Sequence, residues 1–216
     1  LNVPPSKISV IYRGRDSINI KSTLQLSEFG FSADSDFVIV TTGRHEYQKA
    51  QVQLLKAINL VHKQGFKNIK LLILGREGNS SAEMKEFINQ NKLEKDICLA
   101  GYRSDVPSVL SLCHLFAFPS YYEGLGGALI EAQAAGLPII CNDIEVLREV
   151  VVDGENAAFF NSSDEHTIAE KILFLYNNNE LRIQYSKKSR INFEDKFELN
   201  NINRKMLQLY TKLCTQ

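Results

Sequence analysis

Short apolar runs alternate with amphipathic stretches along nearly the whole chain. Several runs consist almost wholly of Val, Ile, Leu and Phe, which is typical of strands buried on both faces of a parallel sheet. The pattern predicts strands over residues 7–12, 36–43, 70–75, 96–101, 114–120, 137–143 and 157–160. It predicts helices over residues 48–63, 81–90, 104–112, 127–135, 144–150, 164–177 and 179–190.

This strand-then-helix order predicts the fold class, because parallel strands need crossover connections that helices usually supply. We expect an α/β fold with a Rossmann-like parallel sheet flanked by helices over residues 1–194. Residues 195–216 are predicted to form a separate amphipathic helix whose apolar face needs a partner surface. Ligands of such sheets bind beyond the carboxyl ends of the strands, so the residues that follow each strand are the candidate site.

Composition limits the possible partners. The 216 residues include 25 Lys plus Arg and 25 Asp plus Glu, so no net field favours nucleic acid. No apolar run approaches the roughly 18 residues of a membrane span. The four scattered cysteines predict buried thiols in a reducing, cytoplasmic compartment rather than a metal site. The chain does not begin with Met, and we expect it to belong to a longer protein.

Two segments that follow strands together predict an anion site. Arg44 and Lys49 flank the entrance of the helix after the strand at 36–43. The glycine-rich segment Gly124–Gly127 opens another helix, where backbone amides can approach a ligand and the helix dipole favours negative charge. The fork of an arginine and the point charge of a lysine match a diphosphate.

Two carboxylates beside this segment predict hydroxyl-bearing groups on the same ligand. Glu123 and Glu131 would repel phosphate, whereas a carboxylate can accept both hydroxyls of a ribose or several of a hexose. An unpaired glutamate within the apolar helix at 127–135 would be costly. A partial dinucleotide fingerprint starting at Gly124 keeps an NAD-binding oxidoreductase domain open as an alternative. A glycosidase carboxylate pair would leave the cations and glycines without a role.

With these residues in place, the chain resembles the retaining glycosyltransferases of family 4, which have the GT-B fold. The resemblance covers nearly the whole chain and corresponds to the C-terminal, donor-binding half of those enzymes. The family motif E-G-F-G-x-x-x-x-E appears as Glu123-Gly124-Leu125-Gly126 through Glu131, and G-R-x-x-x-x-K-G appears as Gly43-Arg44 followed by Lys49-Ala50. Flanking matches include Phe118-Pro119-Ser120 and Val152-Asp153-Gly154.

The resemblance implies transfer of a sugar from a nucleoside-diphosphate sugar to an acceptor, in a setting such as surface polysaccharide synthesis, with neither metal nor cofactor. It implies that Arg44, Lys49 and Glu123 are catalytic: the two cations neutralise the leaving diphosphate and Glu123 holds the donor sugar. The remaining implied donor-binding residues are Gly43, Tyr102, Arg103, Gly124, Leu125, Gly126, Gly127 and Glu131. Of these, Glu131 would take the ribose hydroxyls, and Tyr102 and Arg103 would lie near the base.

The sequence departs from the family in three places. The family segment V-I-P-N-G-V-D is here Val10-Ile11-Tyr12-Arg13-Gly14-Arg15-Asp16, which adds two arginines near the interdomain cleft, and surface salt bridges are their default interpretation. The glycine after the family's lysine is Ala50. The N-terminal, acceptor-binding domain is absent, so we expect this chain alone to transfer sugar negligibly.

The absent domain is the partner implied for the final helix, and the resemblance places the whole enzyme in the cytoplasm, at the inner face of the membrane. A non-catalytic module that binds nucleotide-sugars would look the same in this sequence and stays open as a second alternative.

Overall fold

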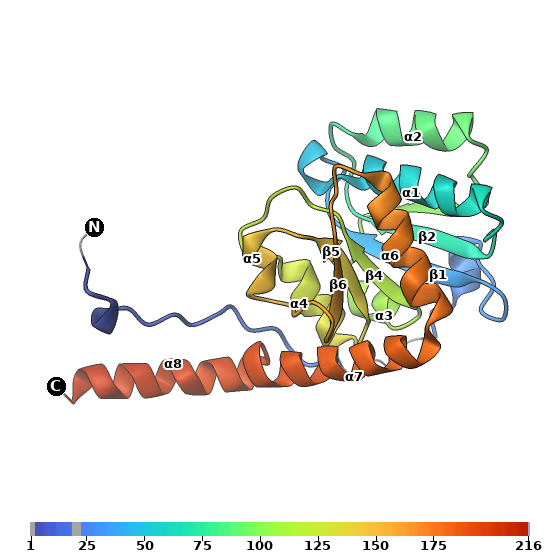
Figure 1. Cartoon of the computed structure of the whole chain (residues 1–216). Coiled ribbons are helices and arrows are strands. Elements are labelled where there is room, and N and C mark those ends of the chain that lie inside the picture. The colour runs from blue at the N-terminus through green and yellow to red at the C-terminus, as the bar shows by residue number, and fades with distance from the viewer. Residues whose placement is uncertain (1–2, 19–22, 216) are drawn as a thin grey trace.

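Six short parallel strands form one sheet at the centre of the structure, with helices on both faces (Figure 1). The computed structural model describes residues 3–18 and 23–215. The strand order is β3-β2-β1-β4-β5-β6, so β1 lies between β2 and β4 and the direction of winding reverses there. The expected Rossmann-like α/β fold is confirmed. In such sheets ligands bind where the strand order reverses.

The bounds of the elements agree closely with most of the predicted ranges. The strands are β1 (Phe37–Thr42), β2 (Ile69–Leu74), β3 (Ile97–Gly101), β4 (Leu115–Phe118), β5 (Ile139–Asn142) and β6 (Ala157–Phe160). The α-helices are α1 (Gln51–Lys63), α2 (Ser81–Gln90), α3 (Val106–Leu110), α4 (Gly127–Ala134), α5 (Glu145–Arg148), α6 (Glu165–Asn177), α7 (Asn179–Lys196) and α8 (Leu199–Cys214). Three 3-10 helices cover Pro5–Lys7, Leu26–Phe29 and Tyr47–Lys49.

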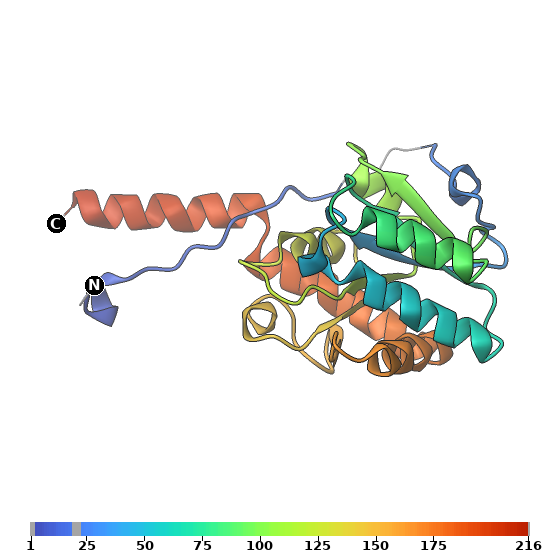
Figure 2. The same ribbon diagram turned by 90° about the horizontal axis from the view of Figure 1, so that it is seen from above.

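The sheet is buried on both faces, as its continuous apolar strands predict. Alternate residues of one strand point to opposite sides: in β1, Ile39 packs with α1, α2 and α6, whereas Val38 and Val40 pack with α3, α4 and α7. Figure 2 shows these helix layers from above. Because both faces of the sheet are covered by helices, neither face is open to a ligand, and the carboxyl ends of the strands are the expected binding place.

The predicted strand at residues 7–12 is wrong. The segment leaves the 3-10 helix Pro5–Lys7 as irregular chain, and Ile8 and Val10 are 56% and 74% exposed. A β-branched pattern favours a strand only where a neighbouring strand and a packing surface exist. Residues 3–13 instead project from the sheet on the same side as α8 (Figures 1 and 2), so they have no neighbouring strand. In the predicted segment, Tyr12 alone is recorded as packing against the core, where its ring contacts that of Phe197.

The C-terminal amphipathic helix begins after a break at Phe197 and Glu198 rather than at residue 195. α7 continues to Lys196, beyond the predicted end at 190, and α8 runs away from the sheet (Figure 1). Its apolar side chains Leu207, Tyr210 and Leu213 are 66%, 57% and 59% exposed. The partner surface for this face stays a prediction.

Ala50 separates the 3-10 helix Tyr47–Lys49 from α1 and adopts a left-handed conformation, with φ 48° and ψ 28°. A Cβ atom makes this conformation costly. We therefore expect Ala50→Gly to raise the free energy of unfolding by about 1 kcal/mol in chemical denaturation. The same change within α1, Ala57→Gly, serves as the control and should lower that free energy by at least a similar amount. Destabilisation by both changes would contradict the argument.

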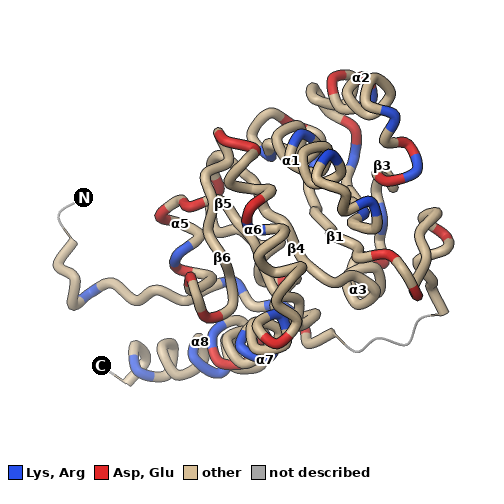
Figure 3. The backbone as a smooth tube through the Cα atoms, turned by 45° about the vertical axis from the view of Figure 1, so that its right-hand side comes forward, with Lys and Arg blue, Asp and Glu red and all other residues tan. Residues whose placement is uncertain are grey.

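Positions with Lys or Arg and positions with Asp or Glu are interspersed along the helices and loops (Figure 3). The formal net charge of the chain is zero. Within residues 3–18 and 23–215, no helix has both the length and the apolar character needed to cross a membrane.

Candidate functional site

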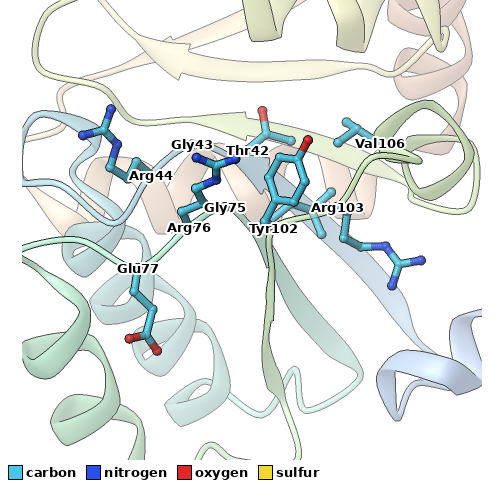
Figure 4. A pocket seen from close by; sticks show the side chains of 10 residues that line it. Thr42, Gly43, Arg44, Gly75, Arg76, Glu77, Tyr102, Arg103 and Val106 are labelled. Atoms are coloured by element: carbon cyan, nitrogen blue, oxygen red, sulfur yellow. The ribbon is translucent and has the colours of Figure 1, made fainter.

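Gly43 follows β1, Gly75 follows β2 and Gly101 ends β3. Gly43 and Gly75 line a cavity of about 630 Å³ (Figure 4). The amide of Gly43 donates to the Leu74 carbonyl, and that of Gly75 donates to the Gly101 carbonyl at 2.8 Å. A Cβ atom on Gly75 would lie 1.9 Å from the Gly43 oxygen. Glycine is thus required for the loops after β1 and β2 to approach this closely. The cavity is lined by Thr42, Gly43, Arg44, Leu74, Gly75, Arg76, Glu77, Tyr102, Arg103 and Val106.

Tyr102 and Arg76 form the part of this cavity that could contact a planar group. The Arg76 guanidinium lies 4.6 Å from the centre of the Tyr102 ring, which is 65% exposed. Arg103, predicted near the base, points away from them (Figure 4). It donates to both carboxylate oxygens of Asp105, at 2.7 and 2.6 Å. Arg76 had no predicted role, although its place directly after the strand at 70–75 was the available signal.

Lys49 and Glu123 meet between the loops that follow β1 and β4. Lys49 Nζ donates to Glu123 Oε1 at 2.5 Å, and the two side chains are 22% and 11% exposed. The amide of Tyr121 donates to the Gln48 carbonyl at 2.8 Å and fixes the loops to each other. The structure therefore brings these two predicted catalytic residues into contact at the point where the strand order reverses.

The glycine-rich segment turns directly into α4. Gly126 is the residue before the helix and has φ 71° and ψ 48°, a left-handed conformation that favours glycine. The Leu129 amide donates to the Gly126 carbonyl at 2.8 Å, whereas the amides of Gly127 and Ala128 have no acceptor among the described residues and are available to an anion. Glu131, on the second turn, accepts a hydrogen bond from Arg15 Nε at 3.0 Å. The two residues are 116 positions apart, and their pairing was not predicted.

Arg44 lines the cavity but does not meet Lys49. Its side chain is 67% exposed, and its nearest carboxylate partner is Glu46, with 3.5 Å between Nη1 and Oε1. In Figure 4 its guanidinium points away from Arg76 and Tyr102. The binding of one diphosphate by Arg44 and Lys49 together, and the catalytic role of Arg44, stay predictions.

His45 follows Arg44 and is buried, with 1% exposure. Its Nδ1 lies 3.1 Å from Ser81 Oγ, and its backbone carbonyl accepts from the Ser80 amide. Burial lowers the pKa of His45 below its ordinary value, because the charged ring would lose its hydration. The residue thus ties the loop after β1 to the start of α2.

In the described part of the chain, no group of three or more His, Cys, Asp or Glu side chains is arranged to hold a metal ion. The chemistry of these loops is that of cations paired with carboxylates, beside backbone amides. Such a set can bind an anion and hydroxyl groups together.

The fold defines a Rossmann-like domain of the kind found in GT-B glycosyltransferases. The chain belongs to the family described as glycosyl transferases group 1, whose model matches residues 25–191.

Named relatives agree with this family. The capsular polysaccharide biosynthesis glycosyltransferase CapM of Staphylococcus aureus is 31% identical over 180 residues, covering 82% of this chain and 46% of the relative. The UDP-Gal:alpha-D-GlcNAc-diphosphoundecaprenol alpha-1,3-galactosyltransferase of Escherichia coli is 31% identical over 151 residues, covering 67% and 38%. The chain therefore spans less than half the length of these two relatives.

Among solved structures, S. aureus TarM in complex with fondaparinux, alpha-GlcNAc-glycerol and UDP matches with a TM-score of 0.80 and 25% identity. The match covers 97% of this chain and 40% of that protein. None of these similarities favours the oxidoreductase alternative.

Proposed function

We propose that this chain is the donor-binding half of a retaining, family 4 glycosyltransferase that uses a nucleoside-diphosphate sugar. The observation that carries the proposal is the contact of Lys49 with Glu123 at the point where the strand order reverses, beside the glycine turn that opens α4. This arrangement places a cation and a carboxylate beside the free backbone amides at the start of α4. A sugar linked to a diphosphate carries the complementary groups.

In this proposal, different residues of the site bind the base, the ribose, the diphosphate and the transferred sugar. The base lies in the cavity near Tyr102 and Arg103, with Arg76 as an additional neighbour. Glu131 accepts the ribose hydroxyls and Glu123 accepts hydroxyls of the transferred sugar. The diphosphate is bound by Arg44, Lys49 and the amides of Leu125, Gly126 and Gly127, together with the close approach that Gly43 and Gly124 allow.

The chemical contribution of these residues is electrostatic. As the bond from the anomeric carbon to the diphosphate breaks, negative charge grows on the leaving oxygen. Donors that already point to that place stabilise the charge without reorganisation. Lys49 is held beside Glu123 by loops that are hydrogen-bonded to each other, so it is suited to this role.

The acceptor is proposed to bind to a second, N-terminal half of the whole enzyme. The exposed apolar side chains of α8 would pack against that half, as the amphipathic pattern suggests. The names of the relatives favour a bacterial surface polysaccharide as product. We propose that the whole enzyme works at the cytoplasmic face of the membrane, and that the present chain alone transfers sugar negligibly.

Titration calorimetry with UDP, GDP, ADP and NAD tests the proposal. We expect one nucleoside diphosphate to bind and NAD to bind at least tenfold more weakly, because NAD would place a second nucleoside where the site is proposed to hold the transferred sugar. Magnesium chelation should leave this binding unchanged, since no metal is proposed. Binding of NAD alone, or of none of the nucleoside diphosphates, would refute the donor-site proposal.

A further inference from the structure

Arg15 enters the candidate site from a segment outside the sheet. Its amide donates to the Phe197 carbonyl and its carbonyl accepts from the Leu199 amide, both at 2.9 Å. A Cβ atom on the preceding Gly14 would lie 2.9 Å from Leu199 Cα, so glycine allows the two segments to cross this closely. The backbone of Arg15 is therefore fixed against the break between α7 and α8.

The side chain of Arg15 lies against the first turn of α4. Nε donates to Glu131 Oε1 at 3.0 Å and Nη1 donates to the Gly14 carbonyl at 3.3 Å. Nη2 lies 2.9 Å from the position that a Cβ atom on Gly127 would occupy. The guanidinium thus reaches the backbone at the helix entrance because residue 127 has no side chain.

This position is electrostatically unfavourable for an isolated cation, because the amino-terminal end of a helix carries partial positive charge. Glu131 compensates the charge from within the same helix. Together with Lys49 and Glu123, the glycine turn is thus surrounded by two cations, each paired with one carboxylate. A diphosphate at the helix entrance would replace the carboxylates as partner of both cations.

We propose that Arg15 is a further donor-binding residue that binds the diphosphate and exchanges Glu131 for phosphate oxygens when the donor binds. The exchange leaves Glu131 to accept the ribose hydroxyls. The inference rests on the function proposed above. The planar guanidinium suits two phosphate oxygens at once, and Arg15 is only 26% exposed, so little of this interaction is screened. The resembled family has Val at this position, so the feature distinguishes this chain.

The test compares UDP with uridine, which shares the base and ribose but lacks phosphate, by titration calorimetry of the whole chain. Arg15→Gln should weaken UDP binding by roughly 10- to 100-fold, the value of a charge-assisted hydrogen bond. Uridine affinity should stay unchanged or rise, because Glu131 is released from Arg15. Arg13→Gln is the matched control: Arg13 is exposed, has no hydrogen bond or ion pair to the described residues, and should not alter either affinity.

Other outcomes overturn the inference. If Arg15→Gln weakens the binding of UDP and the binding of uridine by the same factor, Arg15 only positions Glu131. Tighter binding of both would mean that Arg15 blocks the site. Should Arg15→Gln fail to fold, Arg15→Lys keeps the backbone bonds and the charge, and it should weaken UDP binding several-fold without affecting uridine.

Different results would refute the proposed function and the role of Arg15. If wild-type chain binds none of UDP, GDP or ADP, the donor-site proposal is wrong. If it binds GDP or ADP instead of UDP, the comparison uses that nucleotide and its nucleoside. If the ratio of diphosphate to nucleoside affinity is the same in wild type and Arg15→Gln, only the role of Arg15 is wrong.

Discussion

Lys49→Met is expected to lower the free energy of unfolding by about 2 kcal/mol and to weaken UDP binding at least tenfold. The lysine is the ion-pair partner of Glu123, whose side chain is only 11% exposed. Removing the cation leaves a largely buried carboxylate without its partner, which costs more than the pair itself contributes. The same change removes a positive charge from the proposed diphosphate site. Urea denaturation and titration with UDP measure the two effects.

A double variant separates the two roles of Lys49. Adding Glu123→Gln to Lys49→Met removes the unpaired carboxylate, so most of the lost stability should return, whereas UDP affinity should not. Recovery of UDP affinity in the double variant would show that Lys49 acts only by neutralising Glu123. Lys63→Met, at the exposed end of α1, controls for the general loss of a lysine and should change neither property. In the whole enzyme, both Lys49→Ala and Glu123→Ala should reduce transfer steeply.

The six strands of the sheet could be predicted because a strand that is buried on both faces has a nearly continuous run of apolar residues. Ile69–Leu74 is an example. The wrong strand at 7–12 shows the limit of that signal. Val10 has the side chain of a strand residue but lies 74% exposed, because no strand lies beside it. Strand propensity describes suitability for a pleated, covered surface, and only the three-dimensional structure shows whether such a surface is there.

The loops that form the candidate site could be predicted from the sequence, whereas most contacts between their side chains could not. The rule that ligands bind beyond strand ends pointed to the loops that contain Lys49 and Glu123. In the structure, Lys49 Nζ lies 2.5 Å from Glu123 Oε1. The need of Glu131 for a partner was also apparent from its apolar helix. That the partner is Arg15, however, depends on how the segment before the sheet crosses the break between α7 and α8. One sequence contains no signal for a contact across 116 residues.

The buried position of His45 has a similar origin. Next to Arg44, in a polar stretch after β1, the residue has the sequence context of a surface loop. The loop after β2 covers it, since the amide of His45 donates to the Arg76 carbonyl at 3.0 Å. Burial here comes from two loops folding over each other, which periodicity within either loop does not encode.

The same close approach of two loops makes Gly75 the most sensitive backbone position of the cavity. We expect Gly75→Ala to lower the free energy of unfolding by about 3 kcal/mol, because the new methyl group would lie 1.9 Å from the Gly43 carbonyl oxygen. A backbone atom cannot rotate away as a side chain can, so β1 and β2 must separate at their carboxyl ends. For a chain of this length, the melting temperature should fall by about 6–12 °C in a calorimetric scan.

Gly124→Ala is the matched control, since a Cβ atom on Gly124 would meet no atom within 4 Å. It should alter stability by less than about 0.5 kcal/mol. UDP affinity provides a second measurement for Gly75→Ala, because separation of the loops displaces Gly43 and Arg44 at the cavity floor. A variant that melts within about 2 °C of wild type would mean that the two loops can relax without cost. The floor of the cavity would then be adaptable, and the donor site could not depend on fixed positions of the groups after β1 and β2.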